Sequence, residues 1–216
     1  MREPGRRAGD SAYASSMNLL DHSQVVISQK VKIIELTNEY AIRDPEGNEI
    51  GAIRQEGQTT LKKVARFVSS LDQFMTHTLA VYDTSGAKVL ELTRPRKIMR
   101  SSLLVKDGVG AEVGAIRQQN VFGKIRFGLH DAAGTEIGQI QAENWRAWDF
   151  AIVDATGSEV GRITKSWEGF AKTLFTTADN YLLDISPNVK GTLRLLAFAS
   201  AVGVDTALKQ DDRGLN

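Results

Sequence analysis

The sequence contains no cysteine, which excludes several kinds of structure and chemistry at once. Disulfides, thiolate metal sites, cysteine nucleophiles and palmitoyl anchors all need a thiol. The absence of thiols also suits a reducing compartment. Charge of one sign is lacking too, because the 216 residues carry a formal net charge of only +1. A chain so close to neutrality gives no electrostatic case for a nucleic-acid partner.

Long apolar runs are also missing. Residues 1–23 begin with arginines but never reach the apolar stretch of a secretory signal, so we expect a disordered N-terminal tail. Residues 209–216, KQDDRGLN, are expected to form a second polar tail. The folded domain is therefore predicted to cover residues 24–208, enough chain to bury a real core.

Five segments of equal length share one pattern. They are YAIRDPEGNEIGAI at 40–53, LAVYDTSGAKVLEL at 79–92, LLVKDGVGAEVGAI at 103–116, FGLHDAAGTEIGQI at 127–140 and FAIVDATGSEVGRI at 150–163. In each, Asp is the fifth residue and Gly follows three residues later. Asp accepts hydrogen bonds from the amides of a type I turn, and Gly takes the left-handed conformation that returns the chain. Each segment is therefore predicted to be a β-hairpin.

Repeated aspartates also raise the alternative of a calcium-binding array. The five are Asp44, Asp83, Asp107, Asp131 and Asp154. Each stands alone at its turn, without the clustered oxygen ligands that calcium requires, so we favour the turn role.

The two strands of each predicted hairpin differ in regularity. The first and third residues of every segment are large and apolar, as in Tyr40 and Ile42, and share one face of the incoming strand. On the outgoing strand, Ile50 and Ile53 would fall on opposite faces, and the same holds in three other copies. Either a bulge near the intervening Gly re-aims a side chain, or both faces are partly covered.

The spacing of the hairpins indicates how they assemble. Consecutive turn aspartates lie 39, 24, 24 and 23 residues apart, which favours an antiparallel meander. Additional strands are expected within 24–36 and at 180–185, and a helix with one apolar face within 59–71. Five hairpins with flanking strands are enough to close a barrel.

The C-terminal region predicts an apolar helix after Ser186-Pro187. Its apolar residues surround the helix, which indicates burial on all sides. The alternative is a membrane span, but the uncharged run covers only residues 195–204, about half of the ~20 residues that a bilayer core requires. We therefore predict a mostly β protein, a closed antiparallel barrel of repeated hairpins around a buried apolar C-terminal α-helix.

This architecture and three stretches of sequence resemble the phospholipid scramblase family, within the Tubby-like fold shared with Tubby and plant LURP-one-related proteins. The stretches are LELTRP at 90–95, DFAIVDATGSEVGRI at 149–163 and ITKSWEGFAKTLFTTADNYLLDI at 163–185. The resemblance covers roughly residues 24–208. It implies a protein that binds membrane phospholipids and moves them between leaflets in response to calcium, without an enzyme's catalytic constellation.

The resemblance also locates a calcium loop, from which this sequence departs. The family has acidic residues where this chain has Thr177 and Asn188. The remaining oxygen donors are Asp179, Asn180 and Asp184. Since affinity follows the charge and number of the ligands, we expect a weak calcium site or none, and no other cofactor.

Candidate lipid-binding residues come from the distribution of basic groups. Arg94, Arg96, Lys97 and Arg100 cluster after a predicted hairpin and could face anionic headgroups, although basic surface loops are commonly just solvated. Tryptophan is favoured at membrane interfaces, and the chain has Trp145, Trp148 and Trp167, the last of which we expect in the core.

These features predict a cytoplasmic protein that binds an anionic phospholipid surface, peripherally at the inner face of the plasma membrane. No nucleophile elbow, phosphate-binding loop or histidine pairing indicates an enzyme. The alternative is a soluble Tubby-like barrel that binds a small ligand or a protein partner and has lost the lipid activity.

Overall fold

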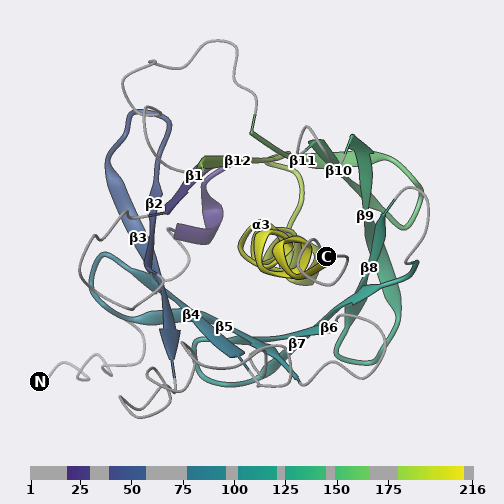
Figure 1. The fold of residues 1–216 in the computed structure, drawn as a ribbon, viewed down its shortest axis with the longest axis horizontal. Coiled ribbons are helices and arrows are strands. Elements are labelled where there is room, and N and C mark those ends of the chain that lie inside the picture. The colour runs from purple at the N-terminus through teal and green to yellow at the C-terminus, as the bar shows by residue number, and fades with distance from the viewer. Residues whose placement is uncertain are drawn as a thin grey trace, which may run out of the picture.

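The computed structural model describes residues 19–29, 39–56, 77–95, 102–120, 125–144, 149–165 and 180–211. Within them, twelve antiparallel strands form a closed barrel around one long helix (Figure 1). The strands are β1 (Gln24–Gln29), β2 (Glu39–Arg43), β3 (Glu49–Glu56), β4 (His77–Asp83), β5 (Lys88–Arg94), β6 (Ser102–Asp107), β7 (Glu112–Gln118), β8 (Arg126–Asp131), β9 (Glu136–Asn144), β10 (Asp149–Asp154), β11 (Glu159–Thr164) and β12 (Asn180–Ile185). The helix is α3 (Gly191–Asp211). The predicted fold class is confirmed.

Strand order follows chain order around the whole barrel, and β1 pairs with β12 to close it. The five repeated segments are the five hairpins β2–β3, β4–β5, β6–β7, β8–β9 and β10–β11. The flanking strand expected at 180–185 is β12, and the one expected within 24–36 is β1. Residues 30–36 and the helix expected within 59–71 lie outside the described residues.

Each hairpin turn has the hydrogen bonds that its Asp and Gly predict. In the first, the Gly47 amide donates to the Asp44 carbonyl at 3.0 Å, and the Asp44 amide donates to the Asn48 carbonyl at 3.0 Å. The Asp44 carboxylate accepts from the Asn48 amide at 2.8 Å. Gly47 has a φ of 92°, in the left-handed region that glycine tolerates. The same two backbone bonds recur in the other four turns.

A bulge in every hairpin explains the irregular outgoing strands. Ile42 lies opposite Gly51 and Arg43 opposite Glu49, so Ile50 is an extra residue without a counterpart. The register shifts at the same place in the other hairpins. Of the two explanations left open by the sequence, the bulge is therefore correct: Ile53 is fully buried and Ile50 also packs against the core.

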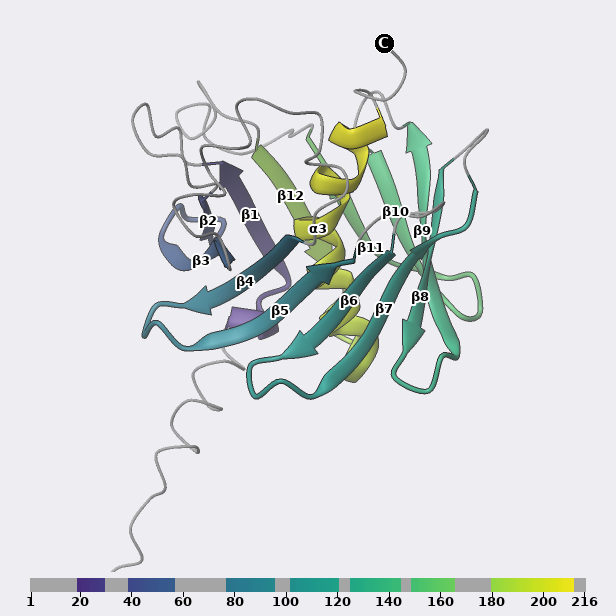
Figure 2. The same ribbon diagram turned by 60° about the horizontal axis from the view of Figure 1, so that its bottom comes forward.

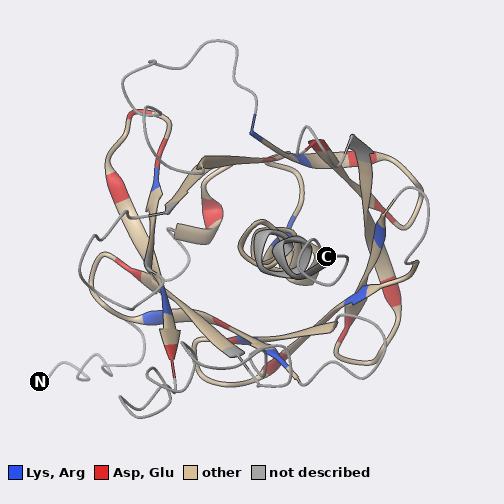
Figure 3. Cartoon of the chain, viewed as in Figure 1, with Lys and Arg blue, Asp and Glu red and all other residues tan. Residues whose placement is uncertain are grey.

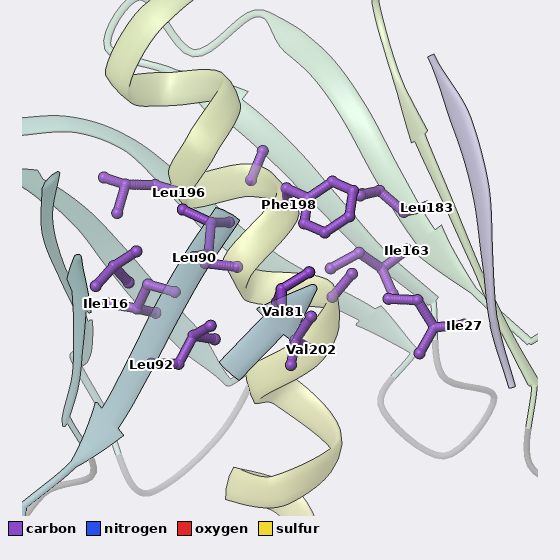
Figure 4. Packing of buried hydrophobic residues seen from close by; sticks show 14 of the residues in the cluster. Ile27, Val81, Leu90, Leu92, Ile116, Ile163, Leu183, Leu196, Phe198 and Val202 are labelled. Carbon is purple, nitrogen blue, oxygen red and sulfur yellow. The ribbon is translucent and has the colours of Figure 1, made fainter. Parts of the chain in front are cut away.

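The barrel interior is filled mainly by α3. Leu196, Ala197, Phe198, Ala199 and Ser200 on this helix are all 0% exposed. Its larger side chains meet inward-facing residues from several strands, including Leu90, Ile116 and Leu183 (Figure 4). The predicted burial of the helix on all sides is therefore confirmed over residues 196–203, whereas its first turn is partly exposed.

A short helical turn at residues 19–21 fills the space beside α3 (Figure 1). Leu19 and Leu20 are 2% and 9% exposed and belong to the core. Residues 19–23 are thus part of the folded barrel, although they were expected to belong to the N-terminal tail. At the other end of the chain, α3 continues to Asp211, past the expected boundary at 208.

The barrel has two different ends (Figure 2). All five hairpin turns lie at one end, which we call the hairpin end, because β2, β4, β6, β8 and β10 run toward it. The other six connections between strands lie between strand ends at the opposite end, which we call the loop end. α3 starts at the hairpin end, after the 186–190 turn, and runs to the loop end, where Gly203 lies against Leu103.

Candidate functional site

The loop end brings together the segments that the sequence singled out. The basic segment 94–100 follows β5, the connection 145–148 holds Trp145 and Trp148, and the connection 166–179 holds Trp167. All three connections leave strands at the same end because the strands between them are paired antiparallel. Trp145, Trp148 and Trp167 themselves lie outside the described residues, so the expectation that Trp167 lies in the core stays a prediction.

Arg94 is the only member of the predicted lipid-binding cluster within the described residues. It is the last residue of β5 and is 8% exposed, with polar or ionic contacts of its own. Arg96, Lys97 and Arg100 lie outside the described residues. Because a buried guanidinium presents little surface to a headgroup, Arg94 is poorly placed for direct lipid contact.

The segment that resembles a calcium loop contains a strand. Asn180 and Asp184 are the first and fifth residues of β12, and a rise of ~3.3 Å per residue puts their Cα atoms roughly 13 Å apart. That separation exceeds the reach of two short side chains toward one ion at about 2.4 Å from each oxygen. Asp184 Oδ2 instead accepts a hydrogen bond from Gln24 Nε2 at 2.7 Å, across the β1–β12 pair.

Asp179, the third predicted calcium ligand, lies outside the described residues. In the part of the chain that the structure covers, no three His, Asp or Glu side chains gather as a metal site would require. The spacing along β12 argues against one ion bound by both Asn180 and Asp184, and a calcium site at Asp179 stays a prediction that needs other ligands.

Two cations lie near the rim of the loop end, on and after β11. Arg162 donates to Asp149 Oδ1 at 2.6 Å and to Glu159 Oε2 at 2.7 Å. The hydrogen bond to Glu159, followed by that to Asp149, raises the pKa of Arg162 despite partial burial. The Lys165 ammonium sits 5.0 Å from the centre of the buried Tyr181 ring. Arg162 is therefore paired with two carboxylates. Lys165 is the last described residue before the 166–179 connection.

A polar network on the outer face of β3, β4 and β5 was not predicted from the sequence. The Tyr82 hydroxyl donates to Glu56 Oε1, and Lys88 Nζ lies 2.9 Å from both Glu56 and Glu91. Arg54 stacks over the Tyr82 ring at 5.1 Å. Glu56 and Tyr82 are 26 residues apart, so no local motif connects them before the strand register is known.

In the described part of the chain, His130 lies close to one carboxylate, that of Glu136. His130 lies on β8, with its Nε2 3.5 Å from Glu136 Oε2. Glu136 also accepts hydrogen bonds from Gln119 and Gln139 at 2.6 and 2.8 Å. A carboxylate already engaged by two amides and a histidine is a structural contact, without a nucleophile positioned beside it.

Comparison with known proteins decides the family. The family model described as Scramblase matches residues 11–208. The chain belongs to the Scramblase family. The match includes residues 11–23, ahead of the region that carried the resemblance in sequence, and agrees with the core position of Leu19 and Leu20 in this family member. No curated protein and no solved structure gives a significant match.

The helices of this scramblase-family chain were also tested against the requirements of a bilayer span. Among the described residues, none is both long enough and apolar enough to cross a membrane.

Proposed function

We propose that this Scramblase-family barrel binds anionic phospholipid surfaces peripherally, on the cytoplasmic side of the membrane, through its loop end. The observation that carries the proposal is that the connections holding Arg96, Lys97 and Arg100, and Trp145 and Trp148, begin and end on strands at this end of the barrel. Basic groups near an anionic surface contribute about 1 kcal/mol each, and indole rings favour the headgroup region.

Within the basic segment, Arg96, Lys97 and Arg100 would contact the headgroups. Arg94 would support the segment without contacting lipid, because it is 8% exposed and fixes the start of the segment to the end of β5. The role requires no catalytic side chain, since binding depends on charge and on interfacial aromatic residues.

Lipid transfer between leaflets is a separate activity from surface binding and needs its own assay. In the folded barrel, α3 is enclosed by strands, with Leu196, Ala197 and Phe198 fully buried. Transfer of lipids would therefore need a rearrangement or an assembly of several copies.

Co-sedimentation with vesicles tests the proposal. The unmodified protein should pellet with phosphatidylcholine vesicles that contain phosphatidylserine, and much less with phosphatidylcholine alone. Arg96→Glu combined with Lys97→Glu removes two attractive charges and adds two repulsive ones, so binding should fall by at least tenfold. Adding calcium to the same mixtures tests the predicted ligands around Asp179.

The matched control is a double reversal at the hairpin end, Lys106→Glu with Lys190→Glu. Both residues are exposed, and both lie at the opposite end of the barrel. The control changes net charge by the same amount, so an equal loss of binding would show that overall charge matters and not the loop end. Absence of binding by the unmodified protein would instead favour a barrel that binds a small ligand or a protein partner.

A further inference from the structure

Acidic and basic residues are distributed around all sides of the barrel wall (Figure 3). Several cations of the outer face have carboxylates as neighbours. Lys88 and Arg162 are ion-paired, and Lys106 lies opposite Glu112 in the register of β6 and β7. Such cations are already balanced by the protein itself, so a binding site for an anion has to be sought among cations that lack this arrangement.

Arg117 and Arg126 are two such cations, on the outer face near the loop end. Arg117 is the last but one residue of β7, and Arg126 is the first residue of β8. Both are exposed, and among the described residues neither guanidinium is hydrogen-bonded or ion-paired. Strand pairing places Arg117 between Ser102 and Gly128, and it places Gln141 beside Arg126. Their cross-strand neighbours are therefore uncharged.

The spacing of the two arginines allows both to reach one anion. Gly128, which lies opposite Arg117, is two residues from Arg126 along β8. The arginines are thus diagonal neighbours on paired strands, with Cα atoms roughly 7–8 Å apart. Guanidinium groups bind phosphate oxygens through their planar fork of donors. Two of them match the charge of a phosphate monoester, about −1.5 to −2 at neutral pH, better than the single charge of a diester.

One carboxylate lies close to this pair. Glu136 Oε2 is 2.7 Å from the position that a Cβ on Gly128 would take. It accepts hydrogen bonds from Gln119 and Gln139 at 2.6 and 2.8 Å, and within the described part of the chain it is not ion-paired to either arginine. Glu136 therefore lowers the positive potential of the face without occupying the arginines, and its removal should strengthen anion binding.

An exposed apolar side chain lies on the other side of Arg117. Leu104 on β6 is 39% exposed. It pairs with Ala115, two residues from Arg117 along β7, so it is also a diagonal neighbour of that arginine. An apolar side chain exposed beside unpaired cations suits an amphiphilic ligand, whose charged headgroup adjoins hydrocarbon, better than it suits free phosphate.

We propose that Arg117 and Arg126 bind the phosphate monoester of an anionic lipid headgroup, with Leu104 against the apolar part of the same lipid. All three residues lie on the neighbouring strands β6, β7 and β8. The inference rests on the proposed function and adds the class of lipid and the wall residues that select it. Phosphatidylserine, a diester, attracts the protein through its charge but does not fill this site.

Co-sedimentation with two kinds of vesicle tests the site. Phosphatidylcholine vesicles contain either phosphatidic acid, which is a phosphate monoester, or phosphatidylserine, at matched surface charge. The unmodified protein should bind the phosphatidic acid vesicles several-fold more tightly. Arg117→Gln combined with Arg126→Gln should lower affinity for phosphatidic acid at least tenfold, and affinity for phosphatidylserine much less. Glu136→Gln should raise affinity for phosphatidic acid.

The matched control removes two exposed cations at the hairpin end, Lys106→Gln with Lys190→Gln. It changes net charge by the same amount and should keep the preference for phosphatidic acid. Unmodified protein that binds both vesicles equally, or an arginine double variant that keeps the preference, would overturn this site and leave membrane binding intact. Protein that sediments with neither kind of vesicle would overturn both proposals.

Leu104→Ser separates a lipid from a soluble phosphate as the ligand. The variant should bind phosphatidic acid vesicles several-fold more weakly than the unmodified protein, because the apolar contact is lost. Inorganic phosphate, added to the unmodified protein at constant ionic strength, should displace it from these vesicles only partly. Full displacement, together with undiminished binding by Leu104→Ser, would show that the arginines take a free phosphate and would overturn the assignment to lipid.

Discussion

Arg194 connects parts of the chain that are far apart in sequence. Its guanidinium donates to the carbonyls of Leu20, Asp21 and His22 at 2.6–2.8 Å, and to those of Ser186 and Val189 at 3.4 and 3.3 Å. The side chain begins in α3 and is 4% exposed, and burial lowers its pKa. These bonds hold the 19–21 turn against the start of the helix and satisfy carbonyls that would otherwise be orphaned at helix ends.

Replacing Arg194 should therefore destabilise the whole barrel. Arg194→Met keeps the apolar stem but leaves up to five carbonyls without this donor, and we expect a loss of about 3 kcal/mol or more in the free energy of unfolding. Urea denaturation measures the loss. Arg194→Lys should recover only part of it, because an ammonium lacks the planar fork that reaches several carbonyls. Equal stability of all three proteins would refute the bridging role.

The Tyr82–Glu56 hydrogen bond predicts a pH-dependent contribution to stability. This bond is the main reason that the pKa of Glu56 lies below its ordinary value of 4.5. A lowered folded-state pKa stabilises the protein above the unfolded-state pKa, and the contribution is lost as pH falls through the folded-state pKa.

Tyr82→Phe removes the hydroxyl that lowers this pKa. At pH 7 the variant should be less stable by about 1 kcal/mol, a modest value because the network is partly exposed to solvent. The difference should shrink as pH falls below 4.5, the ordinary value for Glu56. Denaturation midpoints at a series of pH values measure it, and a gap that widens in acid would contradict the assignment.

Within the β8–β9 hairpin, two glycines are required for different reasons. Gly134 ends the turn with a φ of 84°, and a Cβ there would meet nothing within 4 Å. Gly138 follows the bulge, where a Cβ would lie 2.6 Å from the Val153 carbonyl oxygen on the neighbouring strand. The first position thus needs a left-handed backbone, and the second needs the absence of a side chain.

Substitutions should separate these two requirements. Gly134→Asn should cost less than about 1 kcal/mol, because asparagine tolerates the left-handed region. Gly138→Ala should cost more, about 2 kcal/mol, because the backbone of β10 must move. Thermal denaturation of the pair provides the comparison, and the reverse order of stabilities would show that our account of the bulge is wrong.

The hairpins could be predicted because their information is local. Asp and Gly three residues apart specify each turn, and alternating apolar residues such as Phe150 and Ile152 specify the buried face. The bulges were left open since the spacing of Ile50 and Ile53 fits either explanation. The contribution of Leu19 and Leu20 was missed. Two leucines in a polar stretch do not indicate a core segment by themselves, and the contact that fixes them comes from Arg194, 174 residues beyond Leu20.

For the molecule as a whole, the order of strands could be predicted, but the grouping of the turns could not. Turns and connections alternate along the chain, and only antiparallel pairing of the strands places all five turns at one end of the barrel. The basic segment was identified in sequence. The burial of Arg94, its first member, depends on where β5 ends in the barrel.

Binding of basic residues to an anionic surface also predicts a dependence on ionic strength. Raising salt shortens the Debye length from ~10 Å at 0.1 M to ~3 Å at 1 M, so attraction between the loop end and phosphatidylserine vesicles should weaken steeply. Vesicle sedimentation over this range should show binding lost by the highest salt. Binding that persists unchanged would indicate that apolar insertion dominates.

The position of α3 after the last strand has a consequence for biosynthesis. A ribosome completes all five hairpins before it makes the helix that fills them, and β1 waits for β12 until residue 185 has been added. The nascent barrel therefore exposes inward-facing residues such as Ile42 and Val81, with neither closure nor filling, for as long as translation continues. A stop codon directly before α3, which leaves all twelve strands but removes the helix, should yield no folded product, and the unfinished protein should be a client of chaperones that bind during translation.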